Sequence, residues 1–186
     1  MRTLVLLALA ACSFEHGELP RDGSVRTTDA ARLDAAMPDA PPACTNDLAC
    51  AGPVVAMMCN GGCWAKCTNA FGVGVLGAGI ACGNWGGELA PLRTPADEDC
   101  VSQALFPQQA SWIGLIQAPL QTSPSAGWSW NGDGHALAFT NWDTGQPNDA
   151  SGAETGSEQC AFMTTGGKWQ DDDCSASSLV RFSCRR

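Results

Sequence analysis

Ten cysteines lie after position 43, and this crowding constrains the fold more than any other feature of the sequence. Such a density of cysteine, together with frequent glycine, is typical of a loop-rich domain that is held by cross-links and folds in an oxidising compartment. All seven tryptophans lie after position 63. The folded material is therefore expected in the C-terminal part of the chain.

Five of these cysteines follow one another closely in residues 44–67, which we expect to form a small hairpin-like extension stapled onto the main domain. The spacing Cys59-x3-Cys63-x3-Cys67 differs from the CxxC pairs of structural zinc and from the ferredoxin runs, so disulfides are favoured. Together with Cys100, the five cysteines allow about fifteen pairings, and the sequence does not choose among them. Asn60-Gly61-Gly62 suits a tight turn.

The charge of the chain is acidic, and this excludes one class of partner. From Cys44 onward there are thirteen acids and six bases, which would repel a phosphate backbone, so nucleic acid is not expected as a partner. Seven of the acids fall between Asp143 and Asp173, where Lys168 is the only base. Such a cluster is usually a solvated face. The alternative is a cation site, since calcium is bound by carboxylate and amide oxygens.

The N-terminus has the pattern of an export signal. An apolar run from Leu4 to Ala11 follows an arginine and is too short to span a bilayer, so residues 1–11 are predicted to be a signal peptide. Leu9-Ala10-Ala11-Cys12 resembles the lipobox of bacterial lipoproteins, which implies cleavage before Cys12 and lipidation of that residue. An ordinary signal peptide with a chance cysteine is the alternative. If Cys12 is lipidated, the remaining ten cysteines can all pair in disulfides, which favours the lipoprotein interpretation.

Residues 12–43 are poor in large apolar side chains and rich in Ala, Asp and Pro. Such a segment cannot bury enough surface to offset the entropy lost on ordering, so we expect a disordered tether. The tether and the lipid on Cys12 would attach an exported domain to the membrane. The expected location is the bacterial outer membrane or cell surface.

The remaining sequence alternates between short periodic runs and breakers. Pro95 and the acids after it suit a helix N-terminus and predict a short helical stretch that continues to Leu105. Short strands are predicted at 112–115, 127–130, 159–163 and 179–184. Residues 131–157 have little regular pattern, and a loop of that length is generally functional or disordered.

At this point the motifs together resemble the C-type lectin-like domain over about residues 63–186. The elements that carry the resemblance, in chain order, are Cys82-x3-Gly86-Gly87-x-Leu89, Trp112-Ile113-Gly114-Leu115, Trp128-Ser129-Trp130, Asn141-Trp142, Gly145-Gln146-Pro147-Asn148, Cys160, Trp169-x-Asp171-x-x-Cys174 and Phe182-x-Cys184. Each motif alone is weak, but their order and spacing together are specific.

The resemblance implies an α+β fold for residues 68–186, with two short helices, small antiparallel sheets, a long loop region and several disulfides. It implies the disulfides Cys82–Cys184 and Cys160–Cys174, which leaves Cys100 to pair with the N-terminal extension. The tryptophans of the two core motifs are expected to pack in the interior, because large aromatic side chains dominate the cores of small domains.

The resemblance also implies a single calcium site that binds a sugar. The matching positions, which would act both as metal ligands and as glycan ligands, are Gln146, Asn148, Glu158, Gln170 and Asp171. In the family the Pro147 peptide is cis. Two departures stand out: the motif carries an amide on both flanks of Pro147, and Gln170 stands where the family usually has the shorter Asn.

Three functions compete at this stage. The first is calcium-dependent recognition of a glycan or glycoprotein, and the second is a calcium-independent protein-interaction or adhesion module on the same fold. The third is an enzyme, which is disfavoured because His135 is the only histidine of the domain and the GxSxG, HExxH and SxxK motifs are missing from the sequence. His135, between glycine-rich turns, is expected to be exposed.

Overall fold

The computed structural model of the chain describes residues 43–105 and 109–186. The predicted signal peptide, Cys12 and nearly all of the predicted tether lie outside the described residues. No helix of the described part is both long enough and apolar enough to cross a membrane.

The N-terminal extension is a β-hairpin, as the sequence predicts. Strands β1 (Val54–Cys59) and β2 (Gly62–Thr68) pair antiparallel, with Cys59 opposite Gly62. Asn60 and Gly61 between them both have positive φ, 45° and 73°, which a two-residue turn of this kind requires. Because β2 also pairs with β8 (Arg181–Arg185), the extension belongs to the same sheet as the rest of the domain.

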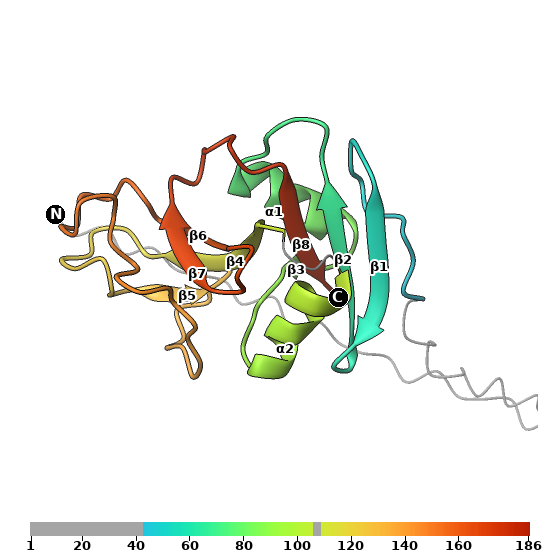
Figure 1. Cartoon of the computed structure of the whole chain (residues 1–186), viewed down its shortest axis with the longest axis horizontal. Coiled ribbons are helices and arrows are strands. Elements are labelled where there is room, and N and C mark those ends of the chain that lie inside the picture. The colour runs from blue at the N-terminus through green and yellow to red at the C-terminus, as the bar shows by residue number, and fades with distance from the viewer. Residues whose placement is uncertain (1–42, 106–108) are drawn as a thin grey trace, which may run out of the picture. The chain divides into compact units, whose positions relative to one another are not determined.

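A single connected sheet forms the centre of the domain (Figure 1). The strand order is β1-β2-β8-β4-β6-β7, with β3 (Glu88–Leu89) paired to β8 and β5 (Trp128–Trp130) paired to β4. The remaining strands are β4 (Ser111–Gln117), β6 (Cys160–Met163) and β7 (Trp169–Asp172). The expectation of small antiparallel sheets differs in one respect, because β4 and β8 pair in parallel at Trp112 and Phe182.

Strand β7 is absent from the strands predicted by sequence. Its residues read Trp-Gln-Asp-Asp, and aspartate is poorly suited to strands. The strand forms because all its residues pair with β6, from Cys160 opposite Asp172 to Met163 opposite Trp169. Tertiary pairing therefore overrides local preference here.

The two short helices implied by the family resemblance are present, and the second begins at Pro95 as predicted. Helix α1 (Val75–Asn84) ends just after Cys82, and helix α2 (Pro95–Asp99) continues into the π-helix η1 (Cys100–Leu105). Thr94 caps α2: its side chain accepts from the Asp97 amide, and the Asp97 carboxylate accepts from the Thr94 amide. This capping box fixes the start of so short a helix.

Strand β4 divides the interior into two apolar clusters. Trp112 lies in one cluster with Phe182 and Cys82, whereas Ile113 and Leu115 lie in the other. Successive side chains of a strand point to opposite faces, so the central strand supports both clusters. Gly114 is required at its position, because a Cβ there would lie 2.5 Å from the carbonyl oxygen of Leu89.

Five disulfides cross-link the described chain. The two pairs implied by the family resemblance are both present, as Cys82–Cys184 and Cys160–Cys174. The pairings that the sequence leaves open are Cys44–Cys63, Cys50–Cys67 and Cys59–Cys100. Cys100 therefore joins helix η1 to the end of β1, which ties the N-terminal hairpin to the main domain.

Candidate functional site

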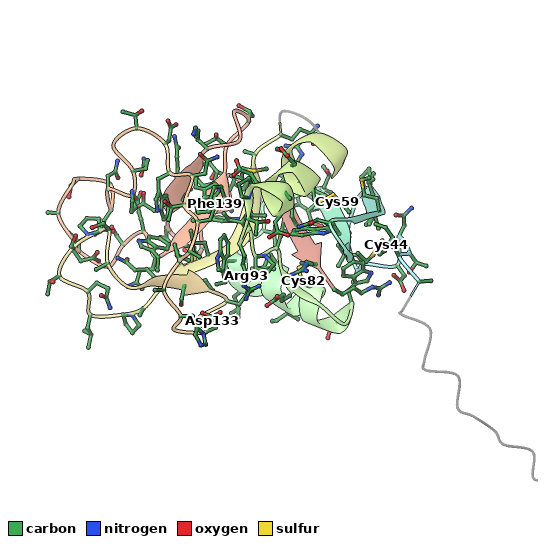
Figure 2. All side chains as sticks on the ribbon, turned by 90° about the horizontal axis from the view of Figure 1, so that it is seen from below. Cys44, Cys59, Cys82, Arg93, Asp133 and Phe139 are labelled. Atoms are coloured by element: carbon green, nitrogen blue, oxygen red, sulfur yellow. A yellow bond between two sulfur atoms is a disulfide. The ribbon has the colours of Figure 1, made fainter. Side chains whose placement is uncertain are left out.

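Residues 131–158, called here the long-loop segment, contain neither helix nor strand, and all of them are described. Aromatic rings attach the segment to the sheet: Trp142 packs against Trp128 and Trp169, with ring centroids 4.9 and 5.9 Å apart, and Phe139 packs against Trp169 at 5.5 Å. In Figure 1 the segment lies at one end of the domain and the hairpin of β1 and β2 lies at the other, and in Figure 2 the labelled Cys44 and Cys59 lie toward the hairpin end.

The buried carboxylate of Asp149 organises the second half of the long-loop segment. Its side chain is 1% exposed. It accepts six hydrogen bonds, which come from the amides of residues 155–158 and from the hydroxyls of Thr155 and Ser157. Four consecutive amides thus converge on one side chain, so the path of the chain toward Glu158 is set by this residue.

The ionised form of Asp149 is strongly preferred in the folded protein. Burial works against the charge, but the hydrogen bonds from Thr155, Glu158 and Ser157 outweigh it and lower the pKa of Asp149 well below its usual range. The carboxylate is therefore charged at neutral pH and keeps its hydrogen bonds.

Two further carboxylates, those of Asp171 and Glu158, are joined by the backbone that follows Pro147. The Asn148 amide donates to both oxygens of Asp171, at 3.1 and 3.0 Å, and the Asp149 amide donates to Oδ2 at 2.8 Å. The next amide, that of Ala150, donates to Glu158 Oε2 at 2.6 Å. Three consecutive amides therefore bridge the carboxylate on β7 and the carboxylate that precedes β6.

The carboxyl group of Glu158 has a pKa above its ordinary value. Burial raises its pKa, the Ala150 amide lowers it, and the nearby charges of Asp171, Asp172 and Asp149 raise it. These negative charges repel the ionised form of Glu158. A bound cation would relieve that repulsion.

Gln146 brings an oxygen to the same stretch of chain. The Gln146–Pro147 peptide is cis, as the family resemblance implies. The side-chain oxygen Oε1 of Gln146 is buried and has no hydrogen-bond partner among the described residues. A buried carbonyl oxygen without a partner carries a desolvation cost, so it is a candidate ligand for a cation.

Gln170, by contrast, is engaged elsewhere. Its Nε2 donates to Asp143 Oδ2 at 3.1 Å. Its neighbour Asp171 is buried, while Gln170 is only half-buried, and adjacent residues of a strand point to opposite faces. The structure therefore connects the backbone of Asn148 and the carboxylates of Asp171 and Glu158 in one hydrogen-bonded cluster. The ligand roles of Gln146, Asn148, Glu158, Gln170 and Asp171 stay predictions.

Asp149 and Asp143 are the two residues of this site that sequence reasoning missed. Both belong to the acidic cluster of residues 143–173, but nothing in the spacing distinguishes them from solvated acids. His135 is exposed, with 86% of its side chain accessible, as predicted.

The family model of the Lectin C-type domain matches residues 75–185, more than half of the chain. The matched region begins at α1 and ends in β8, and so contains the long-loop segment.

Curated relatives match over shorter stretches. Asialoglycoprotein receptor 1 of the rat is 41% identical over 66 residues, which cover 34% of this chain and 21% of the receptor. Mannose-binding protein of the chicken is 30% identical over 98 residues, which cover 53% of this chain and 35% of that protein. The chain thus spans about a third or less of the curated relatives that it matches, and these named relatives are animal proteins.

Solved structures extend the likeness to the fold. The carbohydrate-recognition domain of cow CD23, determined in the presence of a GlcNAc2Man3 oligosaccharide, has a TM-score of 0.59 and 27% identity, and the match covers 73% of this chain and 95% of that one. A calcium-independent type II antifreeze protein has a TM-score of 0.56 and 23% identity over 73% and 96% of the two chains, and shows the fold alone. These likenesses confirm the predicted fold class.

Proposed function

The chain belongs to the C-type lectin domain family, and from this premise we propose that its long-loop segment binds a glycan, free or on a glycoprotein, through one calcium ion. The domains of this family are in general non-enzymatic modules that bind carbohydrate, and the chain is not an enzyme. The observation that carries the proposal is the buried Oε1 of Gln146, which has no hydrogen-bond partner among the described residues and belongs to the same stretch of chain as the amides that join Asp171 to Glu158.

The residues present fit a calcium ion in the chemistry of their donor atoms. Calcium takes about six to eight oxygen ligands. Gln146 and Asn148 offer amide oxygens, and Glu158 and Asp171 offer carboxylates. The backbone amides use part of each carboxylate, but an ionised carboxylate has about four lone-pair positions. Gln146 Oε1 would gain the partner that it lacks.

When bound, the ion would supply an attachment point for two sugar hydroxyls. The side chains of the chain itself would orient the sugar, because the amide nitrogens of Gln146 and Asn148 can donate hydrogen bonds to hydroxyl oxygens. A mannose-type site places a carboxylate acceptor opposite an amide donor. Here both flanks of Pro147 are amides, so we propose that discrimination between mannose-type and galactose-type sugars is weak.

The test is binding of the purified full chain to a glycan array, with calcium and then with EDTA. Calcium should tighten glycan binding relative to EDTA, and calorimetry should detect calcium binding to the chain. Asp171→Ala should abolish both the effect of calcium on glycan binding and the calcium binding itself, because it removes a carboxylate of the cluster. Asp173→Ala is the matched control, since Asp173 is exposed and its carboxylate accepts hydrogen bonds only from Ser175 among the described residues. Glycan binding with the same affinity in calcium and in EDTA, and unchanged by Asp171→Ala, would overturn the proposal.

A calcium-independent interaction module on the same fold is the second candidate. Two observations favour it: Asp171 already accepts two backbone amides, and Gln170 is paired with Asp143. In that case the cluster would hold the loop without a metal. Binding to a protein partner that survives EDTA and the Asp171→Ala change would establish this function instead.

We further propose that the domain is exported and anchored through a lipid on Cys12. Arg186 at the C-terminal end donates to the carbonyl oxygen of Ala43 at 2.7 Å and stacks on Trp85, so the start and the end of the domain meet. This junction lies toward the hairpin end in Figure 1, and the long-loop segment lies at the opposite end. An anchor there would leave the loop accessible. Metabolic labelling with palmitate should mark the chain but not its Cys12→Ser variant.

A further inference from the structure

A cavity lies next to the candidate calcium site in sequence but apart from it in its lining. The paired strands β4 and β5 form one side of this cavity, and the first half of the long-loop segment forms the other. Its volume is about 640 Å³. Pockets that bind small ligands typically have volumes of roughly 300–1,000 Å³. None of the five candidate calcium ligands lines this cavity, so it is separate from the site described above.

The cavity wall has the chemistry of a site for a neutral ligand with one apolar face. Trp128, Trp142 and Leu137 contribute apolar surface, and Ser125, Ser129 and Thr140 contribute hydroxyl groups. Among the described residues that line it, there is no Asp, Glu, Lys or Arg, and His135 is the titratable residue of the wall. In a chain with a net charge of -9, a wall without carboxylates, lysine or arginine disfavours charged ligands, which would lose their hydration without gaining a strong ion pair.

The aromatic part of the wall is held in place before any ligand arrives. Trp128 donates its indole N–H to the carbonyl oxygen of Pro124 at 2.7 Å, and Trp142 is wedged between Trp128 and Trp169. Fixed rings lose little conformational entropy when a ligand binds, which favours binding. The half-buried Trp142 adjoins the cavity and retains some accessible surface.

We propose that this cavity binds a neutral sugar ring without a metal ion. One face of a pyranose carries mainly C–H groups, and these suit the electron-rich face of an indole ring. The hydroxyls at the edge of the sugar can exchange hydrogen bonds with the serine and threonine hydroxyls of the wall. The cavity would thus hold a second sugar position that does not depend on the calcium cluster.

The test uses the full chain labelled with 5-fluorotryptophan, whose seven tryptophans give separate fluorine NMR signals that single Trp→Phe changes assign. The probes are the methyl glycosides of glucose, galactose and mannose. They are titrated in EDTA, so that no calcium is available for the calcium-dependent site. At least one of the three should shift the signals of Trp128 and Trp142 in a saturable way. The other signals should move less.

Two matched variants localise the effect. Ala136 is exposed and lines the cavity, whereas Ala138 is exposed and does not. Ala136→Phe should fill part of the cavity and weaken binding about tenfold or more, a loss of about 1.4 kcal/mol, whereas Ala138→Phe should leave it within about twofold. The dispersion of the fluorine signals reports directly whether each variant is folded.

The inference would be overturned by any of three results: no saturable shift with any probe, equal weakening in both variants, or binding of aryl glycosides but not of methyl glycosides. The last result would assign the cavity to an apolar substituent. Because the titration contains EDTA, failure here leaves the calcium-dependent proposal untouched, and failure of the calcium proposal leaves this one untouched.

Discussion

The two ends of this domain are stabilised by different means. The sheet with its helices and disulfides, called here the frame, is held by strand pairing, two apolar clusters and covalent bonds. The long-loop segment is held by aromatic contacts and by hydrogen bonds from backbone amides to the carboxylates of Asp149, Asp171 and Glu158. Most of the polar bonds of the loop therefore end on acids.

This difference shows how one chain can combine a rigid scaffold with an adjustable binding surface. The frame is held mainly by bonds that do not depend on ionisation, whereas the loop depends on charged carboxylates. Since the pKa of Asp149 is lowered, its stabilisation of the loop is present above the ordinary Asp range and is lost as the pH falls through the lowered value. The loop should therefore respond to acid and cations, and the frame should respond to reduction.

The largest expected effect is the loss of a covalent bond from the frame. Replacing both Cys82 and Cys184 by Ala opens a cross-link between residues 102 positions apart. The chain-entropy argument gives a destabilisation of about 4–5 kcal/mol, which urea unfolding of the purified chain can measure. The matched pair Cys160→Ala and Cys174→Ala, with a separation of only 14, should cost about 3 kcal/mol. Equal losses of unfolding free energy in the two double variants would contradict the chain-entropy explanation.

The next effect should be confined to the loop. Asp149→Ala removes the acceptor of six hydrogen bonds and leaves the amides of residues 155–158 without their partner. We expect a cost of about 2–3 kcal/mol and the loss of calcium-dependent binding, since Glu158 is no longer positioned. Hydrogen exchange should become fast in residues 149–158 and remain slow in β2 and β8. Fast exchange throughout would show that the loop and the frame unfold together.

A smaller effect sharpens the metal proposal. Gln146→Glu adds a carboxylate where Oε1 lacks a partner, so calcium should bind about tenfold more tightly, a gain of about 1.4 kcal/mol. Asn84→Asp makes the same amide-to-carboxylate change at an exposed position of α1 and should leave the affinity unchanged. Calorimetric titration with calcium measures both. A gain in both variants would indicate a general charge effect and no defined site.

The frame was largely predictable from sequence, partly from local signals and partly from the family resemblance. The core strand at 112–115 and the hairpin turn at Asn60-Gly61 depend on residues whose neighbours in sequence determine their role, whereas the two family disulfides were implied by the resemblance. The pairing of the N-terminal cysteines was not predictable, because several partners are equally close along the chain. Strand β7 was missed because its pairing with β6, and not its composition, makes it a strand.

The candidate site was predictable only in part. Family motifs located Gln146, Asn148, Glu158 and Asp171, and the structure places the backbone after Pro147 against two of these carboxylates. The role of Asp149 depends on four amides that reach its carboxylate only when the loop is folded. No spacing in the sequence therefore predicts this role. Likewise, the pairing of Gln170 with Asp143 depends on how the loop passes β7.

The smallest predicted effect tests the frame through its buried amine. Lys66 on β2 is fully buried, and burial together with the charge of Arg181 lowers its pKa to about 8. The unfolded chain, with an ordinary lysine pKa, binds more protons between about pH 8 and 10.5, so stability should rise with pH there and begin to rise just below it. Between about pH 7 and pH 9 the gain should be about 1 kcal/mol in urea unfolding. Lys66→Met should remove this dependence without changing exchange in the long-loop segment, and a slope that persists in the variant would place the titrating group elsewhere.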